Sequence, residues 1–147
     1  MKDKEPMQAL RSIIDTVRVG LLSTANKQGQ PHSRWVTAAR LPGDHRFVYC
    51  VTGSGSLKVA DILENEKVTW SFQTPGLDEV VTLEGRAVVL DNPELKAQVL
   101  EALGQYLQVF WRVQPDTRKL VVIEIEIARV RLFRPMANIN VVEEAIP

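Results

Sequence analysis

The sequence predicts an α+β protein that is mainly β-structure, with about six strands and three helices. Most connections between the predicted strands are hairpins or tight turns, and short connections favour antiparallel pairing. Two of the predicted helices are inserted between strands, where they can flank or plug a sheet. The last predicted strand, residues 119–134, is so long that it has to curve. A small closed barrel accommodates such a strand, so we expect an antiparallel barrel.

The first half of the chain supplies a helix and three strands. Apolar residues recur at helical spacing over residues 6–17, after a proline that suits the first turn. Residues 19–24 and 31–39 are the predicted strands of a hairpin, and residues 26–30 form its polar turn. A second loop then leads to a strand over residues 46–52.

The second half alternates helices and strands. Residues 56–64 form a predicted helix, and residues 67–73 and 79–90 form strands rich in β-branched side chains. Gly85 interrupts the longer strand, which indicates a bend or a close approach by another segment. Asn92 is a typical N-cap, and the proline after it opens a further helix. The apolar stripe of that helix comprises Leu95, Val99, Leu103, Tyr106 and Phe110.

The composition fits one globular domain over residues 1–147, because 147 residues are enough for a core and 45% of them are apolar. The 18 basic residues balance the 18 acidic ones, so no overall field attracts nucleic acid or an anionic membrane, and we expect neither as a partner. Cys50 is the only cysteine, which suits a reducing cytoplasm. No signal peptide or membrane-spanning stretch is visible, so we expect a cytoplasmic protein.

Several familiar catalytic motifs are missing. His32 and His45 are the only histidines, and neither has a partner at metal-ligand spacing, so no metal site is expected. The segment "TGSGS" lacks the Lys-Ser ending of a P-loop and departs from the G-x-S-x-G motif of hydrolases. No G-x-G-x-x-G fingerprint occurs either. Hydrolysis is therefore poorly supported.

The segment "VTGSGSLKVADI", residues 51–62, has features of a phosphate site. Gly53 and Gly55 allow a sharp turn in which consecutive N–H groups converge, at the start of a helix whose N-terminus carries partial positive charge. Lys58 lies in the first helical turn, where a cation is unfavourable unless an anion is also bound there. The alternative is that Ser56 simply caps the helix and Lys58 points into water. This segment alone leaves both interpretations open.

A second cation lies in the segment "PHSRWVT". Strand alternation places His32, Arg34 and Val36 on one face. Arginine in the middle of a strand suits phosphate, which its planar fork can grip. The alternative is an arginine that snorkels at a strand edge. If this strand neighbours residues 46–52, Arg34 and Lys58 can reach the same anion.

The tryptophans are less specific. Each could line a flat cofactor slot, but a buried tryptophan usually belongs to the core. We expect Trp70 and Phe72 in the core. Trp111, at the end of the apolar helix, is a candidate for a dimer interface.

The chain resembles the flavin-binding split-barrel proteins, the superfamily of pyridoxamine 5'-phosphate oxidase, and is most similar to its general stress protein branch. The resemblance covers residues 5–134 and is carried by the order of elements and by "SRWVT", "VTGSGSLKVADILENEKVTWSF" and "LEGRAVVL". It implies a six-stranded antiparallel split β-barrel with three helices. It also implies a homodimer that binds FMN at the subunit interface.

The resemblance further implies which positions bind the cofactor. Arg34, Thr52, Ser56 and Lys58 would hold the FMN phosphate. The other positions that it places at the cofactor are Trp35, Val36, Thr37, Leu57, Gln73 and Trp111. The sequence departs from the oxidase at Leu57, where the oxidase has a second basic residue, and it lacks the C-terminal Arg-His motif that grips pyridoxal. Oxidation of vitamin B6 is therefore not expected, and the phosphate grip would be weaker.

The resulting hypothesis is an FMN-binding flavoprotein that acts as an oxidoreductase with an unknown electron donor or substrate. No catalytic residue can be named. One alternative is a cofactor-free or ligand-sensing stress-related dimeric protein. Another is a split barrel that binds deazaflavin or haem, for which His32 is a possible but weak axial ligand.

Overall fold

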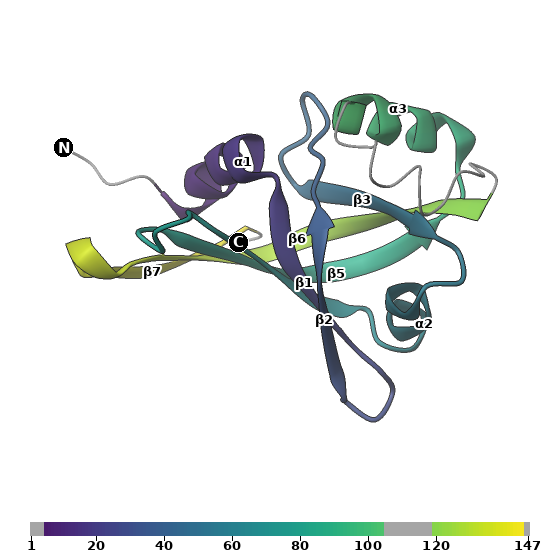
Figure 1. Cartoon of the computed structure of the whole chain (residues 1–147), viewed down its shortest axis with the longest axis horizontal. Coiled ribbons are helices and arrows are strands. Elements are labelled where there is room, and N and C mark those ends of the chain that lie inside the picture. Colours follow the sequence, from purple (N-terminus) through teal and green to yellow (C-terminus); the bar gives the residue numbers. More distant parts are fainter. Residues whose placement is uncertain (1–4, 105–118, 146–147) are drawn as a thin grey trace.

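The computed structural model describes residues 5–104 and 119–145. Each expected helix and strand that falls in these residues is present (Figure 1). The elements in chain order are α1 (Pro6–Val17), β1 (Val19–Ala25), β2 (Pro31–Thr37), β3 (Phe47–Gly53), α2 (Leu57–Glu64), β4 (Lys67–Gln73), β5 (Val80–Leu90), α3 (Pro93–Leu103), β6 (Leu120–Arg134), a 3-10 helix (Pro135–Ala137) and β7 (Ile139–Glu144).

The strands form a single antiparallel sheet in the order β2-β1-β4-β5-β6-β3, and β7 pairs with β6 outside this path. The described residues therefore contain seven strands, and the expected number of six was one too low. β7 was not predicted because four of its six residues are exposed, none is buried, and no alternating pattern marks it as a strand. The mainly β α+β class, with three α-helices in the described residues, is confirmed and is consistent with a split barrel.

The sheet bends where the sequence placed a glycine in a strand. The pairing of β5 with β6 shifts register between Glu84 and Gly85. A Cβ at Gly85 would collide with the backbone carbonyl of Glu126 on β6. The glycine therefore permits the close approach of the two strands, as expected from its position.

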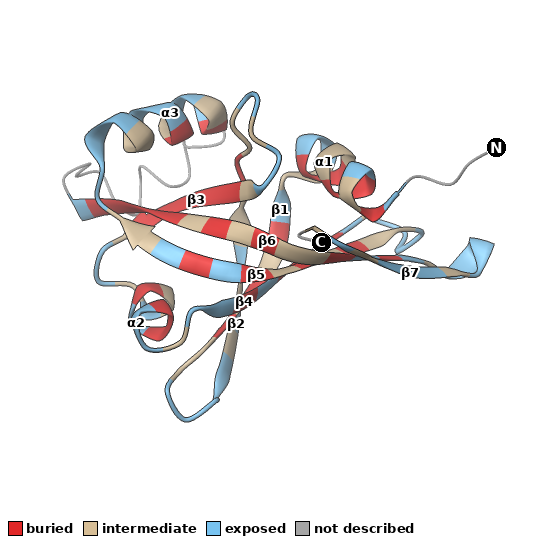
Figure 2. Cartoon of the chain, turned by 180° about the vertical axis from the view of Figure 1, so that it is seen from behind, coloured by how far each residue is buried: buried red, intermediate tan, exposed pale blue. Residues whose placement is uncertain are grey.

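The core lies on the concave side of the sheet, where α1 packs across β4, β5 and β6 (Figure 2). Trp70 and Phe72 of β4 are fully buried in it, which confirms their expected role. A second apolar cluster forms where α3 covers the other side of β3 and β6, through Val99 and Leu103. Of the apolar stripe expected on α3, Tyr106 and Phe110 lie outside the described residues.

Of two candidate N-cap residues, one makes capping hydrogen bonds and the other does not. Asn92 caps α3, since its side-chain oxygen accepts hydrogen bonds from the backbone N–H groups of Glu94 and Leu95, at 2.9 and 3.1 Å. Ser56 occupies the N-cap position of α2, but its side chain makes no capping hydrogen bond.

Within the described residues, no helix combines the length and apolar character that a membrane crossing requires.

Candidate anion-binding site

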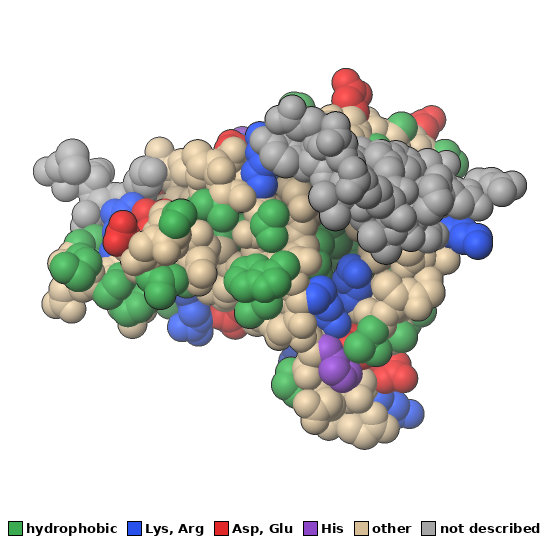
Figure 3. Space-filling model, in the orientation of Figure 1, with side chains coloured by type: hydrophobic (Ala, Val, Ile, Leu, Met, Phe, Trp, Pro, Cys, Tyr) green, Lys and Arg blue, Asp and Glu red, His purple; other side chains and the backbone are tan. Residues whose placement is uncertain are grey.

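The two cations that the sequence singled out come close together between β2, β3 and α2. Arg34 lies on β2, one edge of the sheet path, and Lys58 lies in the first turn of α2, just after β3 at the other edge. Burial lowers the pKa of Lys58, and the positive charge of Arg34 lowers it further. The two side chains are therefore within electrostatic range of each other. Figure 3 shows basic side chains gathered beside a histidine where the β1–β2 hairpin meets α2.

Arg34 is fixed by the protein through one of its terminal nitrogens. Its Nη1 donates to the carbonyl oxygen of Leu22 at 3.2 Å, the hydroxyl of Thr24 at 2.8 Å and the carbonyl oxygen of His32 at 3.0 Å. Its Nη2 lies 3.9 Å from the nearest carboxylate oxygen, that of Asp61. Burial lowers the pKa of the guanidinium, although Asp61 acts in the opposite direction. Arg34 thus keeps donor capacity on the side of Nη2.

Lys58 has fewer interactions than Arg34 to balance its charge. It is partly buried, and in the described part of the chain it makes no hydrogen bond or ion pair. The fully buried thiol of Cys50 on β3 lies within electrostatic range of both cations, but burial raises the pKa of that thiol to about 12. Cys50 is therefore neutral at physiological pH and cannot balance their charge.

Two hydroxyl groups lie at the turn before α2. The Thr52 hydroxyl donates to the Ser56 hydroxyl at 3.2 Å. Ser56 accepts this hydrogen bond, and its own hydroxyl proton can be donated to an acceptor near the helix N-terminus. Arg34, Thr52, Ser56 and Lys58 thus lie in one region, between β2, the end of β3 and the start of α2.

Asp61 is the residue of this region that sequence reasoning missed. Its side chain is 3% exposed, and its Oδ2 accepts from the Thr24 hydroxyl at 2.7 Å and pairs with His32 Nδ1 at 2.8 Å. Burial by itself raises the pKa of Asp61, but the hydrogen bonds from Thr24 and His32 and the charge of Arg34 bring it below its ordinary value. One signal was present in the sequence: Asp61 is a carboxylate between the apolar residues of an amphipathic helix.

The other expected cofactor-binding residues are dispersed. Val36 lies on the Arg34 face of β2 and packs against the core. Trp35, which is 62% exposed, and Thr37 lie on the opposite face of β2, and strand register places Gln73 on that same face of the sheet. Leu57 is exposed at the start of α2. Trp111 lies outside the described residues.

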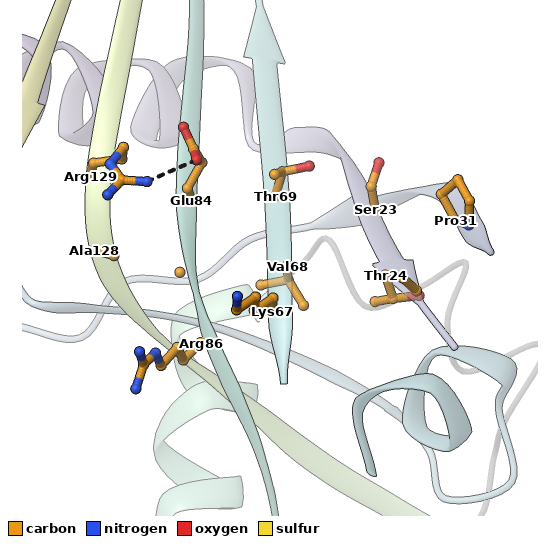
Figure 4. Close-up of a pocket in the computed structure, with 12 residues that line it drawn as sticks. Ser23, Thr24, Pro31, Lys67, Val68, Thr69, Glu84, Arg86, Ala128 and Arg129 are labelled. Carbon is orange, nitrogen blue, oxygen red and sulfur yellow. Dashed lines mark hydrogen bonds and ion pairs between the residues drawn. The ribbon is translucent and has the colours of Figure 1, made fainter. Parts of the chain in front are cut away.

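The sheet face opposite Arg34 carries a cavity of about 530 Å³, lined by residues of β1, β2, β4, β5 and β6 (Figure 4). Glu84 of β5 and Arg129 of β6 lie side by side in its wall and form an ion pair at 3.2 Å. The described residues hold no group of three or more histidine, cysteine or acidic side chains that could bind a metal ion.

The family model for pyridoxamine 5'-phosphate oxidase matches residues 6–134. No curated protein matches the chain. Among solved structures, the chain is similar to General Stress Protein 26 from Bacillus anthracis str. Sterne, with 23% identity over 86% of this chain and 92% of that one, and a TM-score of 0.71.

Two further solved structures share the fold and differ in what they are described to bind. The chain is similar to a pyridoxamine 5'-phosphate oxidase-related, FMN-binding protein from Nostoc punctiforme, with 13% identity over 100% of both chains and a TM-score of 0.66. It is also similar to a heme binding protein from Mycobacterium smegmatis, with 18% identity over 98% of this chain and 60% of that one, and a TM-score of 0.76. The match to the family model spans most of the sequence. The chain therefore belongs to the pyridoxamine 5'-phosphate oxidase family, whose general stress protein 26 and FMN-binding members share its fold.

Proposed function

We propose that this protein binds FMN and that Arg34 and Lys58 hold its phosphate. The observation that carries this proposal is a pair of partly buried cations from separate elements, neither of which has a carboxylate of the described residues within hydrogen-bond distance. Burying charge is costly unless it is paired. A phosphate dianion would offset the cost for both cations at once.

The neighbouring groups fit a phosphate. The Ser56 hydroxyl is not used as a helix cap, and the N-terminus of α2 lies beside it. Helix N-termini and hydroxyl donors favour phosphate oxygens, and the Nη2 side of Arg34 can add a charge-assisted hydrogen bond. The expected phosphate-binding residues thus supply donors and positive charge, and the chemistry of this donor set suits the phosphate of FMN.

FMN would supply electron or hydride transfer when bound. The part of this chain would be to hold the phosphate and orient the cofactor, and we assign no catalytic residue. Oxidation of vitamin B6 is not proposed, because the C-terminal Arg-His motif of the oxidase is absent from the sequence. The donor and the substrate stay unassigned.

We also propose that the protein is a homodimer with the flavin at its interface. Trp35 is 62% exposed and lies on the face of β2 opposite Arg34. One flavin cannot readily touch both faces of a strand in one chain, so a second copy would let both sets of residues contribute. Light scattering at micromolar concentration should give twice 16.5 kDa, and a single 16.5 kDa species would contradict the dimer.

Haem is the second candidate, because two structural relatives are described as a heme binding protein and a heme storage protein. The contact of His32 with Asp61 uses Nδ1 and not Nε2, and a histidine that ligates a metal commonly bonds its other ring nitrogen to a carboxylate. The two neighbouring cations, however, suit a phosphate better than a haem iron. A cofactor-free ligand-sensing role is the third. These possibilities differ in their absorption spectra.

The experiment is to add FMN to the purified protein, desalt it and record the spectrum from 300 to 500 nm. We expect the two flavin bands at close to one FMN per chain. A Soret band in protein loaded with haem instead, together with no retained flavin, would favour the haem alternative. Folded protein that retains neither chromophore would leave only the cofactor-free role.

A further inference from the structure

We propose that Asp61 is a positioning residue for the phosphate site, which acts through Thr24 to hold Arg34 with Nη1 bound to the protein and Nη2 directed to the ligand. The inference rests on the proposed function, because it assumes that Arg34 binds the FMN phosphate. It assigns a role to a buried carboxylate that would otherwise only weaken an anion site.

The direction of the hydrogen bonds supports this role. An ionised carboxylate only accepts, so the Thr24 hydroxyl must give its single proton to Asp61 Oδ2, 2.7 Å away. The lone pairs of the same hydroxyl then face Arg34 Nη1, which donates to it at 2.8 Å. The chain Arg34–Thr24–Asp61 therefore runs in one direction only, and it commits Nη1 to the protein.

The same carboxylate also joins the elements that carry the two cations. Asp61 lies on α2, one helical turn after Lys58, and it bonds Thr24 of β1 and His32 of β2. His32 in turn offers its backbone carbonyl to Arg34 Nη1 at 3.0 Å. Asp61 thereby fixes the helix of Lys58 against the strand of Arg34, and with it the separation of the two cations.

A purely electrostatic role for Asp61 predicts the opposite result. The carboxylate is 3.9 Å from Arg34 Nη2, so its negative charge would repel a phosphate bound there. If charge were its main effect, Asp61→Asn would tighten FMN binding. If positioning is its main effect, the same substitution weakens it.

The test measures the dissociation constants of FMN and riboflavin, which lacks the phosphate, by quenching of flavin fluorescence. Thr24→Val keeps the shape of the side chain and removes the hydroxyl without changing any charge. We expect it to weaken FMN binding about tenfold and to leave riboflavin binding unchanged, since one hydrogen bond that positions the arginine is lost. Thr24→Ser keeps the hydroxyl and should bind FMN like the wild type.

Asp61→Asn is the second variant and should also weaken FMN binding while riboflavin binding stays constant. Far-UV circular dichroism verifies that each variant is folded. If Thr24→Val does not fold, the direction in which Asp61→Asn changes FMN affinity decides whether Asp61 acts by positioning. Tighter FMN binding by Asp61→Asn, or an unchanged FMN-to-riboflavin ratio in Thr24→Val, would overturn the inference. A wild type that binds FMN no better than riboflavin would instead refute the proposed function itself.

Discussion

Two arginine clusters lie on opposite faces of the same sheet, and they differ in how their charge is balanced. In the Glu84 cluster, Arg129 contacts Glu84 at 3.2 Å and Glu144 at 3.1 Å, and Arg131 contacts Glu84 at 2.6 Å. Hydrogen bonds that Arg129 donates to Glu144 and Glu84 raise the pKa of its guanidinium. Around Arg34, in contrast, burial lowers the pKa of the guanidinium, and the nearest carboxylate is 3.9 Å from its Nη2.

This difference separates a structural cluster from a candidate binding site. The cavity of about 530 Å³ borders the Glu84 cluster, in which Arg129 is already paired with Glu84, and its lining also contains Lys67 and Arg86 (Figure 4). In the Arg34 region, the nearest acidic group in the part of the chain that the structure describes is Asp61, 3.9 Å from Arg34 Nη2, and Lys58 has no ion pair there. Arg129 is therefore a weaker candidate for binding an anion than Arg34 and Lys58, because its carboxylate partners are within hydrogen-bond distance.

The largest expected contrast between the clusters is in FMN affinity. Arg34→Ala should weaken FMN binding about 100-fold, because it removes a charge-assisted hydrogen bond and a buried positive charge. Arg129→Ala is the matched control and should leave FMN affinity within about twofold, because its partners are Glu84 and Glu144. Isothermal titration calorimetry measures both. Equal losses in the two variants would erase the distinction between the clusters.

Lys58→Met tests whether the partly buried charge of Lys58 serves ligand binding and does not stabilise the fold. FMN affinity should fall about tenfold, because one charged partner of the phosphate is removed. The free energy of unfolding of the apoprotein should not fall, since the substitution removes a partly desolvated charge without a partner in the described residues. Urea denaturation without FMN measures this. A clear loss of apoprotein stability would mean that Lys58 serves the fold.

Glu84→Gln should have the reverse effects of Lys58→Met: lower stability and unchanged FMN affinity. It removes the acceptor that Arg129 and Arg131 share, so we expect a loss of about 1 kcal/mol in the free energy of unfolding. FMN affinity should stay unchanged, because Glu84 is paired with Arg129 and Arg131 and is not among the residues proposed to contact the flavin. Thermal unfolding with a parallel FMN titration measures both, and a change in FMN affinity would count against two independent clusters.

The smallest expected effect is the pH dependence that Asp61 confers on stability. Its pKa is lower in the folded chain than its unfolded value of about 3.9. The ionised carboxylate therefore stabilises the fold above about pH 4, and this contribution is lost as the pH falls through the lowered folded pKa. Asp61→Asn should remove that part of the acid dependence. Urea denaturation from pH 7 to pH 3 measures it, and identical profiles for both proteins would argue against the lowered pKa.

The sequence allowed the fold to be predicted further than the site. The helix over Pro6–Val17 and the Asn92 cap depend on local signals, and both were predicted correctly. The last strand β7 was missed because it forms by returning along β6 and is mostly exposed. The contact of Asp61 with Thr24 joins residues 37 positions apart, and no spacing rule relates a helix to a strand at that distance.

The most direct test of the account is the ratio of riboflavin to FMN dissociation constants for the wild-type protein at neutral pH. The two ligands differ only in the phosphate, so the ratio isolates the contribution of Arg34, Lys58 and the start of α2. We predict that FMN binds at least about 100-fold more tightly than riboflavin, as expected for two charge-assisted contacts to a dianion. Equal affinities, or no measurable binding of FMN by folded protein, would contradict the claim that this region is a phosphate site.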